Sequence, residues 1–100
     1  IMTEEPFGPI TPIARFSTLE EVVERANSLP LGLAAYAFTE ASKTAREIGE
    51  RVESGMIGIN TVAISTPETP FGGVKESGYG QECGIEGLDA YLHRKFVASA

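Results

Sequence analysis

The chain has few of the residues that build a disulfide or a metal centre. Its 100 residues include one cysteine, Cys83, and one histidine, His93. A single cysteine forms no internal disulfide and is typical of a reducing compartment. One histidine and one cysteine are too few for a conventional zinc site. We therefore expect no metal site and a cytoplasmic protein.

Basic residues and long apolar runs are also scarce. Eight Lys and Arg stand against 14 Asp and Glu, which gives a net charge of -6. Nucleic-acid-binding proteins carry a basic footprint, because phosphate contacts supply most of their affinity. No apolar run approaches the roughly 20 residues that cross a bilayer. We expect neither nucleic acid nor membrane among the partners.

What remains is the composition of an ordinary globular α/β protein, with 42% hydrophobic residues and room for one domain at most. Apolar residues recur at helical or strand spacing in turn along the chain. The predicted elements are a strand over 10–16, a helix from Ser17 to about Leu29, a strand over 33–38, a helix over 40–54, a strand over 56–59, a short helix over 85–91 and a last strand over 95–99.

Local signals set the expected boundaries. Ser17 and Glu20 have the spacing of a capping box, and Pro30 disfavours helix in the residue before it. Gly55 is placed to end the second helix, and Gly49 inside it suggests close packing on a sheet. Alternating strands and helices predict βαβ units with a parallel sheet, whose ligands lie beyond the carboxyl ends of the strands. The loop after Asn60 leaves from such an end.

The most distinctive segment is PFGGVKESGYGQECGIEG, from Pro70 to Gly87, which holds six of the chain's 11 glycines. That density indicates a shaped loop, because glycine is most useful where φ is positive or another group comes close. A phosphate-binding loop is disfavoured, since the order of lysine and Ser/Thr that such loops need is absent.

Two motifs coincide in this chain. The first is E-x-F-G-P over 5–9, and the second runs from a GIN strand end at Asn60 through PFGG, K-x-S-G-x-G-x-E and GL-x-x-Y to a K-x-V tail at Lys95. Together with ANSLPLGLAAYAFT over 26–39, they resemble the C-terminal part of the NAD(P)-dependent aldehyde dehydrogenase superfamily. The resemblance covers essentially the whole chain, in order and spacing.

The resemblance implies a fold and an activity. Residues 1–93 would be part of the family's catalytic domain, and residues 94–100 its oligomerisation tail, which pairs with another subunit. Family members oxidise aldehydes to acids with NAD or NADP through a cysteine thioester. Their nucleophile, general base and main dinucleotide-binding region precede E-x-F-G-P, so we expect this chain to be a piece of a longer enzyme and inactive alone. Cys83 follows PFGG, away from the family's nucleophile position.

Two residues of the first motif are candidates for cofactor binding. Glu5 matches the glutamate that accepts hydrogen bonds from the nicotinamide ribose hydroxyls, a role that suits a carboxylate. Phe7 matches the aromatic that packs near the nicotinamide. The alternatives are a solvated acid and a core aromatic.

Three residues are candidates for the aldehyde site. Ile64 and Ser65 lie where succinate-semialdehyde dehydrogenase-like members hold the substrate's distal carboxylate, and Phe71 resembles the pocket aromatic of PFGG. One hydroxyl donates one hydrogen bond, which is weak recognition by itself. Ser65 would otherwise cap a turn before Pro67, and Phe71 would be a core residue.

The remaining candidates divide between relay and structural roles. Glu82 matches a glutamate of a buried proton-relay path, with an ion pair as the equal alternative. Lys75 and Ser77 are predicted to make structural hydrogen bonds, and His93 to lie at the surface. The predicted partners are a small aldehyde, the missing N-terminal part and a second copy of the enzyme. The rival interpretation is a free-standing α/β binding module without catalysis.

Overall fold

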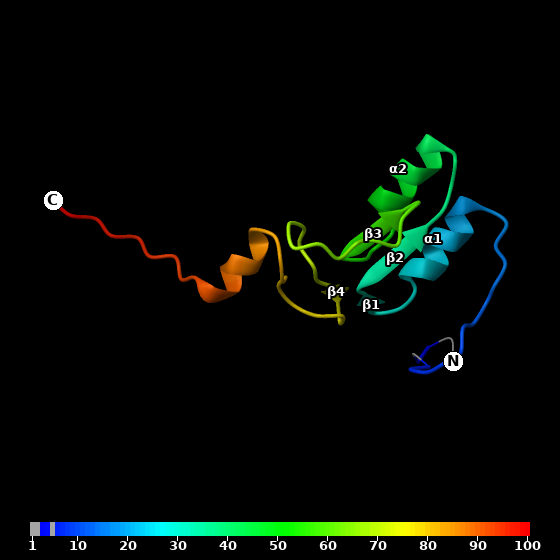
Figure 1. Cartoon of the computed structure of the whole chain (residues 1–100), viewed down its shortest axis with the longest axis horizontal. Helices are drawn as coiled ribbons and strands as arrows, with labels where there is room; N and C mark the ends of the chain where they lie inside the picture. The colour runs from blue at the N-terminus through cyan, green and yellow to red at the C-terminus, as the bar shows by residue number, and fades with distance from the viewer. Residues whose placement is uncertain (1–2, 5) are drawn as a thin grey trace.

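The computed structural model describes residues 3–4 and 6–100 (Figure 1). Glu5, a candidate cofactor residue, lies outside them. Along the described chain the elements are α1 (Leu19–Asn27), β1 (Leu31–Gly32), β2 (Ala34–Ala37), α2 (Ser42–Arg51), β3 (Met56–Ile59), β4 (Val74–Lys75) and the 3₁₀-helix η1 (Glu86–Tyr91).

A βαβ unit forms the centre of the molecule. Strands β2 and β3 pair in parallel, with Ala34 opposite Met56 and Ala37 opposite Ile59. Helix α2 connects them and packs on β3, and α1 packs beside α2 (Figure 1). The predicted parallel pairing is confirmed. The short strands β1 and β4 pair antiparallel beside this unit, an arrangement that the sequence did not indicate.

Helix α1 begins one residue later than predicted, with half of a capping box. Thr18 is the N-cap, and its hydroxyl accepts a hydrogen bond from the amide of Glu21 at 3.1 Å. The carboxylate of Glu21 accepts from the amide of Ser17, the residue before the N-cap, at 2.8 Å. The first bond satisfies a backbone donor that a helix start leaves unpaired, and the second holds the chain that enters the helix. The helix ends at Asn27, two residues before the predicted Leu29.

An ion pair joins the two helices, with the guanidinium of Arg51 3.2 Å from the carboxylate of Glu20. A hydrogen bond to its own backbone amide, followed by the bond to Arg51, lowers the pKa of Glu20 below its ordinary 4.5. A lowered carboxyl pKa stabilises the fold above the unfolded-state pKa, and that contribution is lost as pH falls through the lowered value. The pair is exposed, so its contribution is small.

Four local expectations differ from the structure. The segment 10–16 is irregular rather than a strand, since Pro12 has no amide to donate and the described residues offer it no partner strand. Helix α2 ends at Arg51, before Gly55, and Gly49 is open to solvent rather than packed on a sheet. Residues 95–99 carry no strand here and run away from the body (Figure 1). Their pairing with a second subunit stays a prediction.

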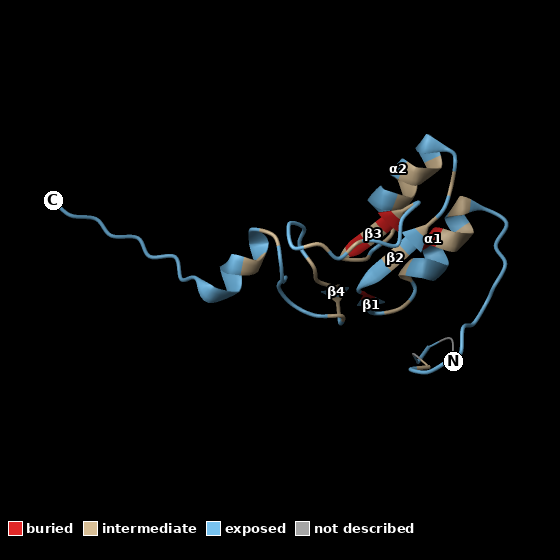
Figure 2. Ribbon diagram, viewed as in Figure 1, coloured by how far each residue is buried: buried red, intermediate tan, exposed pale blue. Residues whose placement is uncertain are grey.

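Few of the described residues are buried (Figure 2). Among the described residues, the buried hydrophobics are Val23 and Met56. Strands of parallel sheets are usually buried on both faces, whereas β2 alternates between exposed and half-buried positions. The radius of gyration is 17.3 Å, whereas a compact domain of this length has about 13 Å. The described residues therefore do not enclose a full core.

Candidate functional site

The candidate site starts where β2 and β3 end. Asn60 follows β3 with a left-handed φ of 56°. Its side-chain oxygen accepts from the amide of Thr39 at 2.8 Å, and its side-chain nitrogen donates to the Thr39 carbonyl at 2.9 Å. These two hydrogen bonds hold together the two chain segments that leave the sheet. Sequence reasoning placed Asn60 at the strand end but missed this contact; asparagine's tolerance of left-handed backbone was the available signal.

The loop over 61–69 leaves from this point. Ile64 is half-buried, and its side chain lies over Gly58 of β3, 2.9 Å from the position that a Cβ there would take. Ser65, the next residue, is exposed. The structure thus anchors the loop through Ile64 and leaves Ser65 at the surface.

A closed loop of the glycine-rich segment follows. Phe71 and Glu82 exchange two backbone hydrogen bonds of 2.7 Å each, which close the chain between them. The amide of Gly84 donates to the carbonyl of Pro67 at 3.0 Å and ties this loop to the preceding one. A groove of about 710 Å³ lies alongside, lined in part by Phe71, Tyr79, Glu82, Cys83, Leu88 and Tyr91.

The structure brings together two of the candidates and separates a third. Phe71 and Glu82 line the same groove, although Glu82 is exposed here rather than buried. Phe7 is 96% exposed and lies in a hollow formed by its own segment, residues 6–12. Cys83 and His93 are exposed, as was predicted for His93.

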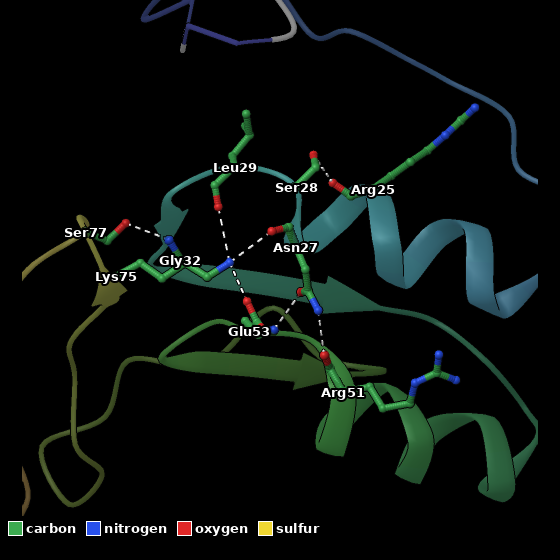
Figure 3. A network of polar contacts seen from close by, with 9 residues as sticks. All are labelled: Arg25, Asn27, Ser28, Leu29, Gly32, Arg51, Glu53, Lys75 and Ser77. Carbon is green, nitrogen blue, oxygen red and sulfur yellow. Dashed lines mark hydrogen bonds and ion pairs between the residues drawn. The ribbon is translucent and has the colours of Figure 1, made fainter.

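Lys75 and Ser77 make the structural hydrogen bonds that the sequence predicted (Figure 3). The hydroxyl of Ser77 accepts from the amide of Gly32 at 2.8 Å, and the ammonium of Lys75 donates to two backbone carbonyls. Asn27 belongs to the same network, with its side chain bonded to the backbone of Arg51 and Glu53. These partners are 24 and 26 residues away along the chain, so no local pattern indicated them.

The described part of the chain contains neither a metal-binding cluster nor a membrane-spanning helix. Over residues 3–4 and 6–100, no group of three or more His, Cys, Asp and Glu side chains is arranged to hold a metal ion. In the same residues, no helix has the length and apolar character to cross a membrane.

Comparison with known proteins decides the family. The model of the "Aldehyde dehydrogenase family" matches residues 1–97. The chain belongs to the aldehyde dehydrogenase family. The resemblance inferred from E-x-F-G-P and the PFGG segment is therefore confirmed.

Known aldehyde dehydrogenases and related enzymes share nearly half of the residues. The chain is 46% identical over 97 residues to 4-(hydroxymethyl)benzenesulfonate dehydrogenase of Comamonas testosteroni, covering 97% of this chain and 20% of that protein. It is 44% identical over 96 residues to mitochondrial succinate-semialdehyde dehydrogenase of Rattus norvegicus, covering 96% and 18%. The crystal structure of succinate-semialdehyde dehydrogenase from Burkholderia pseudomallei superposes with a TM-score of 0.86 at 46% identity, covering 90% and 19%. The chain thus spans about a fifth of these relatives.

Proposed function

We propose that this chain is the C-terminal part of the catalytic subunit of an NAD(P)-dependent aldehyde dehydrogenase. The observation that carries the proposal is the family match over residues 1–97, which corresponds to about a fifth of the relatives' length. The full enzyme would oxidise an aldehyde to the carboxylic acid through a cysteine thioester. Its nucleophile and general base would lie in the residues that complete it.

NAD or NADP is the proposed cofactor, and two residues of this chain would contact it. The ring of Phe7 is almost fully exposed, so its face is accessible for contact with a nicotinamide or ribose. Glu5 would accept hydrogen bonds from the ribose hydroxyls. NAD or NADP would supply the hydride acceptor, and this chain's residues would orient it.

The proposed substrate is an aldehyde with a distal anionic group, and succinate semialdehyde is the first candidate. Ser65 is exposed on a loop that Ile64 anchors, so its hydroxyl is available to donate to a carboxylate. Phe71 would line the pocket. A sulfonated aldehyde is the second candidate, because a relative of 46% identity is named a 4-(hydroxymethyl)benzenesulfonate dehydrogenase.

The direct test uses the full-length protein encoded by the reading frame that contains this segment. Purified protein would be supplied with NAD or NADP and a panel of succinate semialdehyde, a sulfonated benzaldehyde and an uncharged aldehyde. We expect NAD(P)H formation, with the highest kcat/KM for an anionic aldehyde. If the reading frame starts at Met2 and no aldehyde is oxidised, the rival interpretation of a free-standing binding module would replace the proposal of an enzyme.

Ser65→Ala in the full-length enzyme tests the carboxylate contact. We expect KM for succinate semialdehyde to rise about 10- to 150-fold, since a hydrogen bond to a charged group contributes about 1.5–3 kcal/mol and each 1.4 kcal/mol is a factor of ten. KM for an uncharged aldehyde of similar length should change little. Ser42→Ala, the same substitution on α2, serves as the matched control in steady-state kinetics. An equal rise for both aldehydes would reject the contact.

Three further assignments belong to the same proposal. Glu82 would act in a proton relay once the rest of the enzyme covers it, and the segment 95–99 would pair with a second subunit through its unpaired backbone groups.

A cytoplasmic location is proposed from the single cysteine, whereas the rat relative is named mitochondrial. Fractionation of cells that express the full-length protein would decide between these locations.

A further inference from the structure

The ammonium group of Lys75 lies at the junction of α1, β1 and β4 (Figure 3). It donates to the carbonyl oxygens of Asn27 at 3.0 Å and Leu29 at 3.2 Å, and it pairs with the carboxylate of Glu53 at 2.5 Å. A lysine ammonium has three donors, so each has an acceptor here. The side chain is 25% exposed, and these contacts are therefore partly shielded from water.

The two backbone acceptors, the carbonyls of Asn27 and Leu29, lie at the C-terminal end of α1, whereas Glu53 follows α2. A helix leaves its last carbonyls without intrahelical partners, and its dipole places negative charge there. The side chain of Asn27, at this end, accepts from the amide of Glu53 and donates to the carbonyl of Arg51, each at 2.8 Å. Lys75 therefore binds at the point where the ends of α1 and α2 are already joined.

The backbone of Lys75 has a left-handed φ of 55°. Glycine adopts this conformation without cost, whereas a residue with a Cβ is strained in it. A lysine occupies this strained position, and its ammonium is bonded to all three acceptors. The contacts of the side chain, rather than the backbone conformation, therefore account for a lysine at this position. A backbone hydrogen bond next to Lys75 also fixes the end of β4: the amide of Glu76 donates to the carbonyl of Pro30 at 2.9 Å.

We propose that Lys75 is a positioning residue that fixes the glycine-rich segment, and with it the aldehyde pocket, against the joined ends of α1 and α2. Phe71 lies four residues before Lys75 and is bonded through its backbone to Glu82. A shift of β4 would therefore displace Phe71 and Glu82, which both line the groove. The inference rests on the proposed function, because it takes Phe71 as a residue of the aldehyde site.

Lys75→Met in the full-length enzyme is the test, since methionine keeps an unbranched stem but has no charge. We expect KM for the aldehyde to rise about tenfold with kcat changed less than about threefold, as for lost ground-state positioning. Lys75→Arg keeps the positive charge but replaces the compact ammonium with a planar guanidinium, so it should raise KM less than Lys75→Met does. A lower melting temperature with an unchanged KM would show a merely structural role and overturn the proposal.

Hydrogen exchange gives a second readout that does not need turnover. In Lys75→Met, the amides of Phe71, Glu76 and Glu82 should exchange about tenfold faster or more, because their protection depends on local opening of this segment. Lys43→Met is the matched control: its ammonium makes a 3.6 Å pair with Glu47 on an exposed helix face, and neither readout should change.

The two readouts separate this inference from the proposed function. Faster amide exchange in Lys75→Met, together with no aldehyde oxidation by the wild type, would reject the proposed function and retain the positioning role of Lys75. Amide exchange in Lys75→Met at the wild-type rate would reject the positioning role, whatever the enzyme oxidises.

Discussion

Replacing Gly55 with alanine in the full-length enzyme is expected to lower kcat/KM for the aldehyde about 100-fold or to prevent soluble expression. A Cβ at this position would overlap the carbonyl oxygen of Gly72, lie 2.8 Å from its carbonyl carbon and lie 3.0 Å from the Cα of Gly73. All three atoms are backbone, so no side-chain rotation relieves the clash. Overpacking costs about 1–3 kcal/mol where side chains can adjust, and the cost here should reach or exceed that range. Steady-state kinetics and calorimetry would measure both effects.

The matched control is Gly49→Ala in α2. An added Cβ there has no neighbour within 4 Å among the described residues. Alanine favours helix over glycine by about 1 kcal/mol, so this variant should keep its activity and gain stability. The outcome that would contradict the argument is a Gly55→Ala enzyme as stable and active as wild type. In that case PFGG would not lie as closely on the chain after α2 as the structure shows.

The 100-residue chain by itself is expected to show no cooperative thermal unfolding and no aldehyde oxidation. Val23 and Met56 are its buried hydrophobic residues within the described ranges, while the side chains of Phe7, Tyr79 and Phe96 are at least 90% exposed. Burial of apolar surface is the main favourable contribution to folding and has to offset the loss of chain entropy, and few apolar side chains are buried here. Circular dichroism, size-exclusion chromatography and an NAD(P)H assay would test both statements.

The matched comparison is the full-length protein under the same conditions, which should unfold cooperatively and turn over. Exposed apolar surface also favours association, so we expect the short chain to elute ahead of a 10.7 kDa monomer. A sharp transition in a monomeric short chain would favour the free-standing module. Turnover by the short chain, free of contaminating enzyme, would show that it carries its own nucleophile.

Much of the local structure could be predicted from the sequence. Apolar residues at helical spacing predicted α1 and α2, and the runs LAAYAF and MIGI contain β2 and β3. The strand expected at 10–16 was wrong, because the apolar pattern there is interrupted by Pro12 and lacks a described partner strand. The one-residue shift of the cap to Thr18 shows a common limit, since adjacent Ser and Thr both fit the capping pattern.

The candidate site was predictable only as residue types. Ser65, Phe71 and Glu82 were singled out from motif positions, but their exposure and the bridge between Phe71 and Glu82 depend on how the loop closes. The contacts of Asn60 with Thr39 and of Lys75 with Asn27 join residues 21 and 48 positions apart. Such pairs follow from the path of the chain, which a local pattern does not contain.

The glycines on either side of the end of α2 show this division most clearly. The sequence by itself determined the family, the βαβ order and the presence of a shaped loop, because these depend on residue type and spacing along the chain. Only the tertiary structure decided that Gly55 needs to lack a side chain while Gly49 does not. The physical reason is steric: a glycine's importance depends on which backbone lies opposite it, and that backbone comes from a distant part of the chain.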